Sequence, residues 1–267
     1  MSDDCVSFET DDGVTTITFD DPDRRNPLSH DVKTELLSVL PTLPDDEDVR
    51  CVVFQGAGSA FSSGGDIDAM KERRRLQDEG GFEEVLREEL RLANRMVRTV
   101  HTLPIPTIAK LDGPAVGSGA ALALACDVRL ASESGRIGFG FRHVGLSVDS
   151  GVSYLLPRLV GLSKAKDLAL TGEIVDAETA RELGLVDRLY DDDEFETEAS
   201  EYVETLATGP SVALEHIKLL MNGSFDTDLQ SALEREKAAQ EVVAHTDDHV
   251  EGVDAFLEKR SPEFTGQ

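Results

Sequence analysis

Two glycine-rich segments could place backbone N–H groups around one bound oxygen atom. The first is Ser62-Ser63-Gly64-Gly65, and the second, about fifty residues later, is Gly117-Ser118-Gly119. Each is expected between a strand and a helix start, where unpaired N–H groups and the helix dipole attract negative charge. Two such groups that converge on a carbonyl oxygen form an oxyanion hole. Each segment alone also fits an ordinary tight turn, and a dinucleotide loop is disfavoured because the third glycine is missing.

A carboxylate that could move a proton follows at Asp149, in the small-residue turn from Leu146 to Gly151. A positioned aspartate can act as a general base. It could instead cap the helix that we expect to begin at Gly151, which is a common role of aspartate. His143 is interpreted as a packed or surface residue at the end of a strand rather than as a base.

Acidic residues far outnumber basic ones, since 53 Asp and Glu against 26 Lys and Arg give a formal net charge of −27. The acids are spread along the chain rather than gathered in one tail. Such a composition favours a protein adapted to concentrated salt, where screening removes most self-repulsion. An acidic protein with a basic partner is the alternative. Nucleic-acid binding is disfavoured, because it requires a basic face.

The cysteines and the apolar runs indicate where the protein works. Cys5, Cys51 and Cys126 have the spacing of neither a disulfide framework nor a metal site. No apolar run has the length of a membrane span, and no signal peptide is evident. We therefore expect a soluble cytoplasmic protein that binds no metal, membrane or nucleic acid.

The order of predicted elements indicates an α/β core followed by helices. A hairpin is expected in Val6–Phe19, and Ser29 can cap a helix from His30 to Leu40. Apolar spacing predicts one long amphipathic helix in Lys71–Val100, on which Arg73 to Arg75 are interpreted as surface residues. The other predicted strands are Val49–Gln55, Thr107–Leu111, Val128–Ala131, Gly135–Phe141 and Leu185–Tyr190; the other helices are Ala120–Ala125, Gly151–Leu159, Ser163–Leu170, Ala177–Leu183 and most of the chain from Glu194, with breaks at Gly209-Pro210 and Asn222-Gly223.

Five segments in order resemble one known family. They are Arg24–Ser29, Ala60–Ile67, Gly113–Asp127, Leu155–Gly161 and Phe256–Arg260. On these segments the chain resembles the crotonase superfamily of enoyl-CoA hydratases and isomerases over nearly its whole length. The resemblance implies a spiral of strand-strand-helix repeats in residues 1–195. It also implies a helical region in residues 196–267 that mediates assembly into a homotrimer or a hexamer of two trimers.

The same resemblance implies an acyl-CoA substrate, with no cofactor other than the coenzyme A of the thioester itself. The backbone N–H groups of Gly65 and Ser118 would form the oxyanion hole. Arg24 and Arg25 would meet the nucleotide end of coenzyme A, a role that suits arginine. The remaining residues expected near the substrate are Pro27, Ser63, Gly64, Asp66, Ile67, Gly117 and Phe141.

The sequence departs from the hydratases of this family at two positions. Ala121 and Phe141 stand where the resemblance places two glutamates, and neither side chain can move a proton. Asp149 instead falls where some isomerases place a single catalytic aspartate. We therefore expect a double-bond shift, in which Asp149 removes a proton from one carbon and returns it to another. Phe139 and Phe141 are expected to form an apolar wall that raises the pKa of Asp149.

Other functions stay open. A hydratase that uses Asp149 or a further acid is the main alternative. Dehalogenation with Asp149 as nucleophile is disfavoured, because few aromatic residues are near it to hold a ring. A non-enzymatic scaffold or RNA-binding relative with a decayed site is also disfavoured, because the chain is acidic and both glycine segments are intact.

Overall fold

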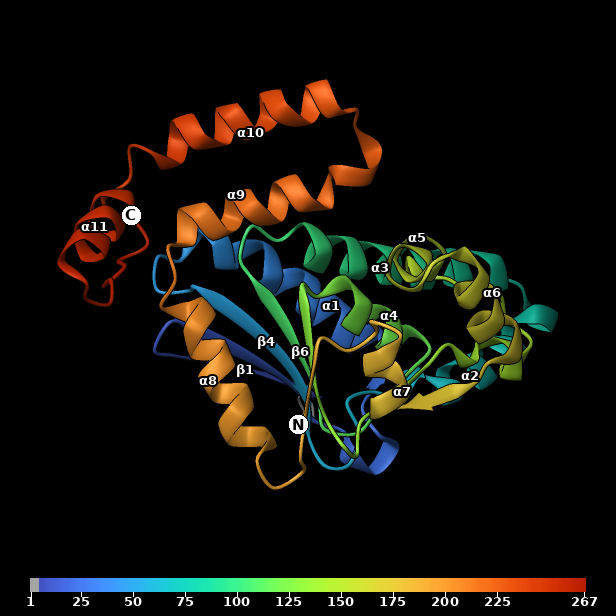
Figure 1. The fold of residues 1–267 in the computed structure, drawn as a ribbon. Coiled ribbons are helices and arrows are strands. Elements are labelled where there is room, and N and C mark those ends of the chain that lie inside the picture. The colour runs from blue at the N-terminus through green and yellow to red at the C-terminus, as the bar shows by residue number, and fades with distance from the viewer. Residues whose placement is uncertain (1–4) are drawn as a thin grey trace.

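A computed structural model describes residues 5–267, and a six-stranded sheet lies at its centre (Figure 1). Strands β1 and β2 form the predicted hairpin, with Asp12 and Gly13 at positive φ in its turn. The remaining neighbours in the sheet run parallel. The strands in spatial order are β1 (Val6–Asp11), β2 (Val14–Phe19), β4 (Cys51–Gly56), β6 (Thr107–Leu111), β8 (Val128–Ser132) and β11 (Arg188–Tyr190).

The chain repeats one unit as it crosses this sheet. Each of four strands of the large sheet is followed by a short strand of a second layer and then by helical structure. The short strands pair with one another, β3 with β5 and β7 with β9, and β10 (Ile174–Asp176) joins β9. The units are β2, β3 (Pro27–Leu28) and α1 (His30–Val39); β4, β5 (Gly64–Gly65), α2 (Ile67–Glu79) and α3 (Phe82–Thr102); β6, β7 (Pro114–Val116) and α4 (Ser118–Ala125); and β8, β9 (Arg136–Gly138) and α5 (Val152–Val160).

The central strands of the large sheet are buried on both faces. Val52 and Phe54 of β4 belong to the main core together with apolar residues of α1, α3 and α4. Cys51 and Val53, which point the other way in a strand, pack with Phe195 and further apolar residues of α8 (Phe195–Ala207). Burial raises the pKa of the Cys51 thiol to about 12. This thiol is therefore protonated and unreactive at neutral pH.

Two predicted elements are wrong in their extent. The long helix expected in Lys71–Val100 is two helices, α2 and α3, which are separated at Gly80 and Gly81 with φ of 84° and 94°. These values suit glycine and end a right-handed helix. The strand expected in Gly135–Phe141 ends at Gly138, and residues 140–144 form a 3₁₀ turn. In contrast, α1 begins as predicted, with the Val32 N–H donating to Ser29 Oγ at 3.3 Å.

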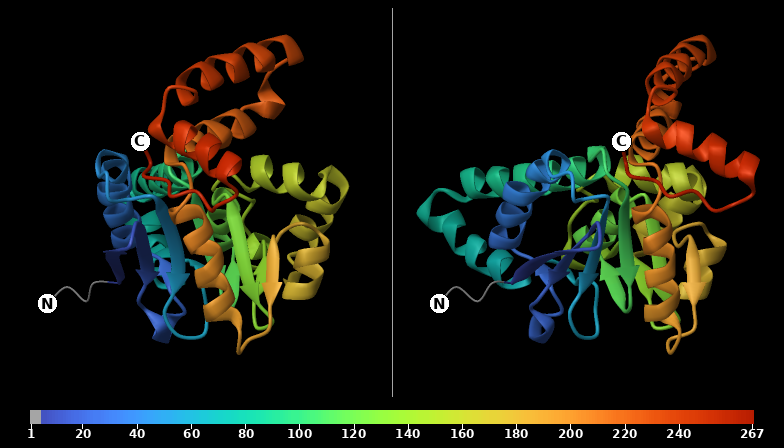
Figure 2. Two further views of the ribbon diagram at one scale, coloured as in Figure 1. Left: turned by 60° about the vertical axis from the view of Figure 1, so that its left-hand side comes forward. Right: turned by 90° about the vertical axis from the view of Figure 1, so that its left-hand side faces the viewer.

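Helices dominate the last part of the chain and break at both predicted places, and also between Val243 and Asp247, where no break was predicted. After α6 (Leu162–Thr171) and α7 (Ala177–Glu182) come α8, α9 (Ser211–Asn222), α10 (Leu229–Val243) and α11 (Asp247–Glu258). Helix α9 lies against the body, where Lys218 donates to the Ile105 carbonyl, and α10 and α11 extend beyond it (Figure 1 and Figure 2). None of the described helices is long and apolar enough to cross a membrane.

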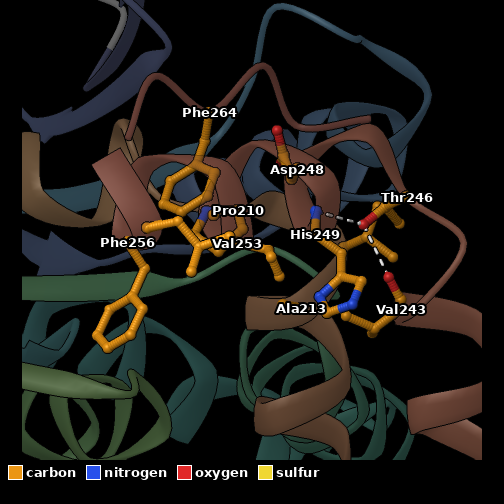
Figure 3. Close-up of a pocket in the computed structure, with 12 residues that line it drawn as sticks. Pro210, Ala213, Val243, Thr246, Asp248, His249, Val253, Phe256 and Phe264 are labelled. Atoms are coloured by element: carbon orange, nitrogen blue, oxygen red, sulfur yellow. Dashed lines mark hydrogen bonds between the residues drawn. The ribbon is translucent and has the colours of Figure 1, made fainter. Parts of the chain in front are cut away.

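An apolar hollow lies between α9, α11 and the C-terminal tail (Figure 3). Thr246 caps α11, since its hydroxyl accepts the His249 N–H and donates to the Val243 carbonyl. The buried Asp248 carboxylate accepts N–H groups of Thr265 and Gly266 and so holds the tail against α11. The side chains of Phe256 and Phe264 lie beside this hollow, far along the chain from the glycine segments.

Candidate active site

A cavity of about 260 Å³ brings the two glycine segments together with Asp149. Its lining comes from the starts of α1, α2 and α4, from one side of α3, and from the 3₁₀ turn after β9. Most of these elements meet where a short strand of the second layer passes into a helix. The repeated unit of the fold therefore concentrates helix N-termini at this cavity.

The two glycine segments touch through their backbones. Ser62 pairs with Ala115, and the Val116 N–H donates to the Ser62 carbonyl at 2.9 Å. A Cβ atom added to Gly64 would lie 2.4 Å from the Val116 carbonyl oxygen and 3.2 Å from the Ser118 nitrogen. Glycine is therefore required for this approach. Gly65 and Ser118 both line the cavity, and the Ser118 N–H begins α4, where it has no partner within the helix.

Asn26 and Ser62 hold the first segment in place. Asn26 is buried at a φ of 54°, and its amide donates to the carbonyls of Ala57 and Ala60 at 2.9 and 2.7 Å. The Ser62 hydroxyl donates to the Asn26 carbonyl at 2.7 Å and accepts the Gly64 N–H. These contacts pin the turn that presents Gly65. Our sequence reasoning did not assign this role to Asn26, although it lies in one of the matching segments.

Asp149 reaches the cavity without capping a helix. The residue at the start of α5 is Gly151, and no side chain caps that helix, so the interpretation of Asp149 as an N-cap is wrong. The Asp149 Oδ1 atom is buried and accepts no hydrogen bond. Burial raises the pKa of Asp149, while the Ser150 hydroxyl and the Lys33 ammonium oppose this rise. The result is an aspartate whose proton affinity exceeds that of an exposed one.

A charged pair that our sequence reasoning missed also lines the cavity. Lys33 of α1 donates to Glu89 of α3, and His30 contacts the other oxygen of the same carboxylate. Burial alone would raise the pKa of Glu89, but the hydrogen bonds and charges of Lys33 and His30 outweigh burial and lower it. The signal was present in the sequence, because Glu89 lies three residues after Leu86 and four before Ala93, on the apolar stripe of the helix.

Some of the aromatic and basic residues near Asp149 in the sequence line the cavity, and others do not. Phe141 lines the cavity, as predicted, but Phe139 lies in the core outside it, so only one ring contributes to the expected wall. His143 lies in the 3₁₀ turn and lines the cavity, with Nε2 3.0 Å from the Gly172 carbonyl oxygen. Arg73, expected on the surface, also lines the cavity. Ala121 is fully buried in α4.

The residues predicted to contact coenzyme A fall into two groups. Ser63, Asp66, Ile67 and Gly117 line the cavity. Four others do not: Arg24, Arg25, Pro27 and Gly64. Arg24 nevertheless contacts the cavity edge, because its guanidinium pairs with Asp66 at 3.2 Å as well as with Asp21. Among the side chains that the structure describes, no group of three or more His, Cys, Asp or Glu residues could hold a metal ion.

Known proteins resemble this chain over nearly its whole length. The profile of the family described as enoyl-CoA hydratase/isomerase matches residues 9–267. A 1,2-epoxyphenylacetyl-CoA isomerase from Escherichia coli is 34% identical over 96% of this chain and 96% of its own length. A putative enoyl-CoA hydratase from Thermus thermophilus is 39% identical over 94% of this chain and 97% of its own. The solved structure of an enoyl-CoA hydratase from Bacillus anthracis, 34% identical, superimposes with a TM-score of 0.90 over 98% of this chain and 100% of that chain. The expected crotonase fold is therefore confirmed.

Proposed function

The chain belongs to the enoyl-CoA hydratase/isomerase family, and we propose that it catalyses a double-bond shift in an enoyl-CoA thioester. One observation carries this proposal. Asp149 lines the same cavity as Gly65 and Ser118. One oxygen of its carboxylate is buried and accepts no hydrogen bond. A proton acceptor and two candidate oxyanion donors therefore surround one space.

In the proposed reaction, Asp149 acts as a proton shuttle. Its carboxylate removes a proton from C2 of a 3-enoyl-CoA, and the thioester becomes a conjugated enolate. The Gly65 and Ser118 N–H groups donate to the enolate oxygen, where the charge develops. Asp149 then returns its proton to C4, which leaves the conjugated 2-enoyl-CoA and the regenerated carboxylate. Atoms and charge balance without a cofactor.

The other carboxylates of the cavity are already engaged. Asp66 caps α2 by accepting the Ala69 N–H at 3.0 Å and also pairs with Arg24. Glu89 is held by Lys33 and His30. Among the described residues that line the cavity, Asp149 is thus the carboxylate best placed to exchange a proton. This favours chemistry that uses one acid over hydration by the usual pair of carboxylates.

A hydratase remains the second candidate because Glu89 shares the cavity with Asp149. One carboxylate could take a proton from a water molecule that attacks the double bond, and the other could donate a proton to the neighbouring carbon. Glu89 suits the acid role poorly, because Lys33 and His30 lower its pKa by more than burial raises it. This candidate requires Glu89 to leave Lys33 during the reaction.

A paired assay in concentrated salt distinguishes the two reactions. Purified wild type, Asp149→Asn and Glu89→Gln are each mixed with a 3-enoyl-CoA and with crotonyl-CoA, and the conjugated thioester absorbance is followed. We expect absorbance to appear from the 3-enoyl substrate and to be abolished by Asp149→Asn. Hydration of crotonyl-CoA that is abolished by Glu89→Gln would instead establish the hydratase.

The oligomeric state of the enzyme is part of the same proposal. We propose that residues 196–267 form the contacts of a homotrimer or a hexamer, beyond a core that ends near residue 195. The exposed apolar side chains of α10 and α11, such as Leu229 and Phe256, support this assembly.

Arg24 and Arg25 would meet the nucleotide end of coenzyme A. The net charge of −27 supports a cytoplasm with concentrated salt.

A further inference from the structure

The contact between Lys33 and Glu89 occupies a costly position. Lys33 is 8% exposed, and the Glu89 side chain is 15% exposed, so both charges are largely removed from water. A buried ion pair commonly adds no more stability than well-packed apolar side chains of the same volume. Both members of the pair line the ligand cavity, so they are placed to act on a ligand as well as on stability.

The Lys33 ammonium has hydrogen-bonding capacity to spare. It carries three N–H groups, and among the described residues its one partner is Glu89. The Ser150 hydroxyl, 1% exposed, also lines the cavity, but it already interacts with Asp149, whose pKa it lowers. Buried polar groups normally have partners, and leaving them without one costs free energy. A ligand atom that accepts hydrogen bonds at this end of the cavity would remove that cost.

The surrounding charges indicate which acceptor fits. Glu89 already neutralises Lys33, and Asp149 adds a second carboxylate nearby. An anionic acyl group would meet both carboxylates, whereas a neutral oxygen gains the free donors without repulsion. Arg73, on α2, and His30 and His143 are the other basic groups that line the cavity. The apolar remainder suits a carbon chain and includes Leu28, Met70, Ala93, Met96, Val144 and Leu146.

We propose that Lys33 determines specificity, and that the cavity takes an acyl-CoA whose acyl group carries a neutral oxygen acceptor beyond the carbons on which Asp149 acts. Hydroxyl, ether and carbonyl oxygens all meet this description. The inference rests on the proposed function only in that an acyl-CoA thioester occupies this cavity. Lys33 donates to the acyl oxygen, and Glu89 keeps Lys33 in place and cancels its charge.

Calorimetric titration in concentrated salt tests this inference by binding alone. The probes are hexanoyl-CoA and two ether analogues whose oxygen lies beyond C4, one with an ether oxygen in place of the C5 methylene and one with a methoxy group on C5. None of them can isomerise. We expect wild type to bind at least one ether analogue about tenfold more tightly than hexanoyl-CoA, the effect of one hydrogen bond to a charged group. Equal binding of all three thioesters overturns the inference and leaves the proposed function standing. Absence of any binding overturns both.

Variants assign the preference to Lys33. The double variant Lys33→Met/Glu89→Leu removes both charges together, because Lys33→Met alone would leave a buried carboxylate without its partner. We expect it to bind hexanoyl-CoA at least as tightly as wild type and to lose the preference for the ether. Lys110→Met is the matched control, since Lys110 is also 8% exposed and pairs with Glu196 away from the cavity. A preference that persists in the double variant, or that disappears in the control, contradicts the assignment.

Discussion

At the scale of single residues, the Asp149 carboxyl group combines a buried oxygen that lacks a hydrogen bond with a raised pKa. Desolvation is the main cause, because burial disfavours the charged form. A base works best when its pKa lies near the operating pH, so this shift favours proton transfer. The positive charge of Lys33 lowers this pKa and so favours the charged form of Asp149, which is the form that accepts a proton.

The pH dependence of the proposed isomerisation follows from this shift. We expect kcat/KM for a 3-enoyl-CoA to fall as the pH drops through the pKa of Asp149, because only the carboxylate accepts a proton. Since burial raises this pKa, the acidic limb should lie above about 3.9, the ordinary value for aspartate. Asp149→Asn should reduce kcat by roughly 10²–10⁴-fold. A pH–rate profile in concentrated salt measures both, and a limb at or below the ordinary value would contradict the assignment.

The melting temperature of the same variant separates loss of the base from damage to the fold. Between the unfolded and the raised native pKa of Asp149, the native chain holds a proton that the unfolded chain has released. Stability therefore falls as the pH rises through this window, and the cost persists above it. Asparagine has no charge to bury, so Asp149→Asn should melt at a higher temperature than wild type at pH 7. A lower melting temperature would attribute the lost activity to misfolding.

At the scale of elements, the approach of β5 to the start of α4 decides the geometry of the proposed oxyanion hole. Gly64 has a φ of 91° and no room for a Cβ beside the Val116 carbonyl. Both features follow from the pairing of Ser62 with Ala115, which brings the two turns side by side. The residues after each turn then present their N–H groups to one cavity.

A comparison of two alanine variants isolates this close approach. Gly80 has a similar φ of 84°, but a Cβ added there meets nothing within 4 Å. Gly80→Ala should therefore reduce the free energy of unfolding by about 1–3 kcal/mol, because the φ of 84° and ψ of 159° at this position are a combination that essentially only glycine adopts. Gly64→Ala should cost more, because backbone atoms must also move, and it should abolish turnover. Denaturant titration and the isomerase assay report the two effects. Equal destabilisation by the two variants would show that the segments around Gly64 and Val116 can move apart without a further loss of stability.

At the scale of the whole molecule, α10 exposes leucine side chains that an assembly would cover. Leu229 and Leu233 are 76% and 51% exposed and lie one turn apart on one face of the helix. We expect the wild type to be a trimer or hexamer by light scattering, and Leu229→Asp/Leu233→Asp to be smaller. Ala238→Asp, exposed on the opposite side of α10, is the control that should keep the wild-type mass. A wild-type monomer would refute the proposed assembly.

Salt should stabilise the molecule as a whole. With a net charge of −27, the native chain repels itself, and the Debye length shortens from about 10 Å at 0.1 M salt to about 3 Å at 1 M. We expect the melting temperature to rise by roughly 5–10 °C between 0.1 M and 2 M potassium chloride. Sucrose, which is excluded from protein surfaces but does not screen charge, is the control. A melting temperature that stays constant or falls with salt would contradict adaptation to salt.

The sequence by itself determined the order and type of most elements and the family. The hairpin at Asp12-Gly13, the Ser29 cap and the breaks at Gly209 and Asn222 depend on local propensities, which neighbouring residues express directly. The same local reasoning failed where a tertiary contact or a backbone reversal decided the outcome. Gly80 and Gly81 divided one predicted helix, and residues 140–144 left the predicted strand.

Only the tertiary structure decided which chemical groups share the cavity. Phe139 and Phe141 are two residues apart, yet only Phe141 lines the cavity, because the strand ends at Gly138 and the chain turns into the 3₁₀ segment from Gly140. Lys33 and Glu89 are 56 residues apart and meet through the packing of α1 on α3. The place of Glu89 on the apolar stripe of its helix indicates that it is partly buried, but its contact with Lys33 has no local signature, since that contact depends on how distant segments pack. For that reason Asp149 could be proposed as a base from its position in the chain, whereas the Lys33–Glu89 pair beside it emerged from the fold.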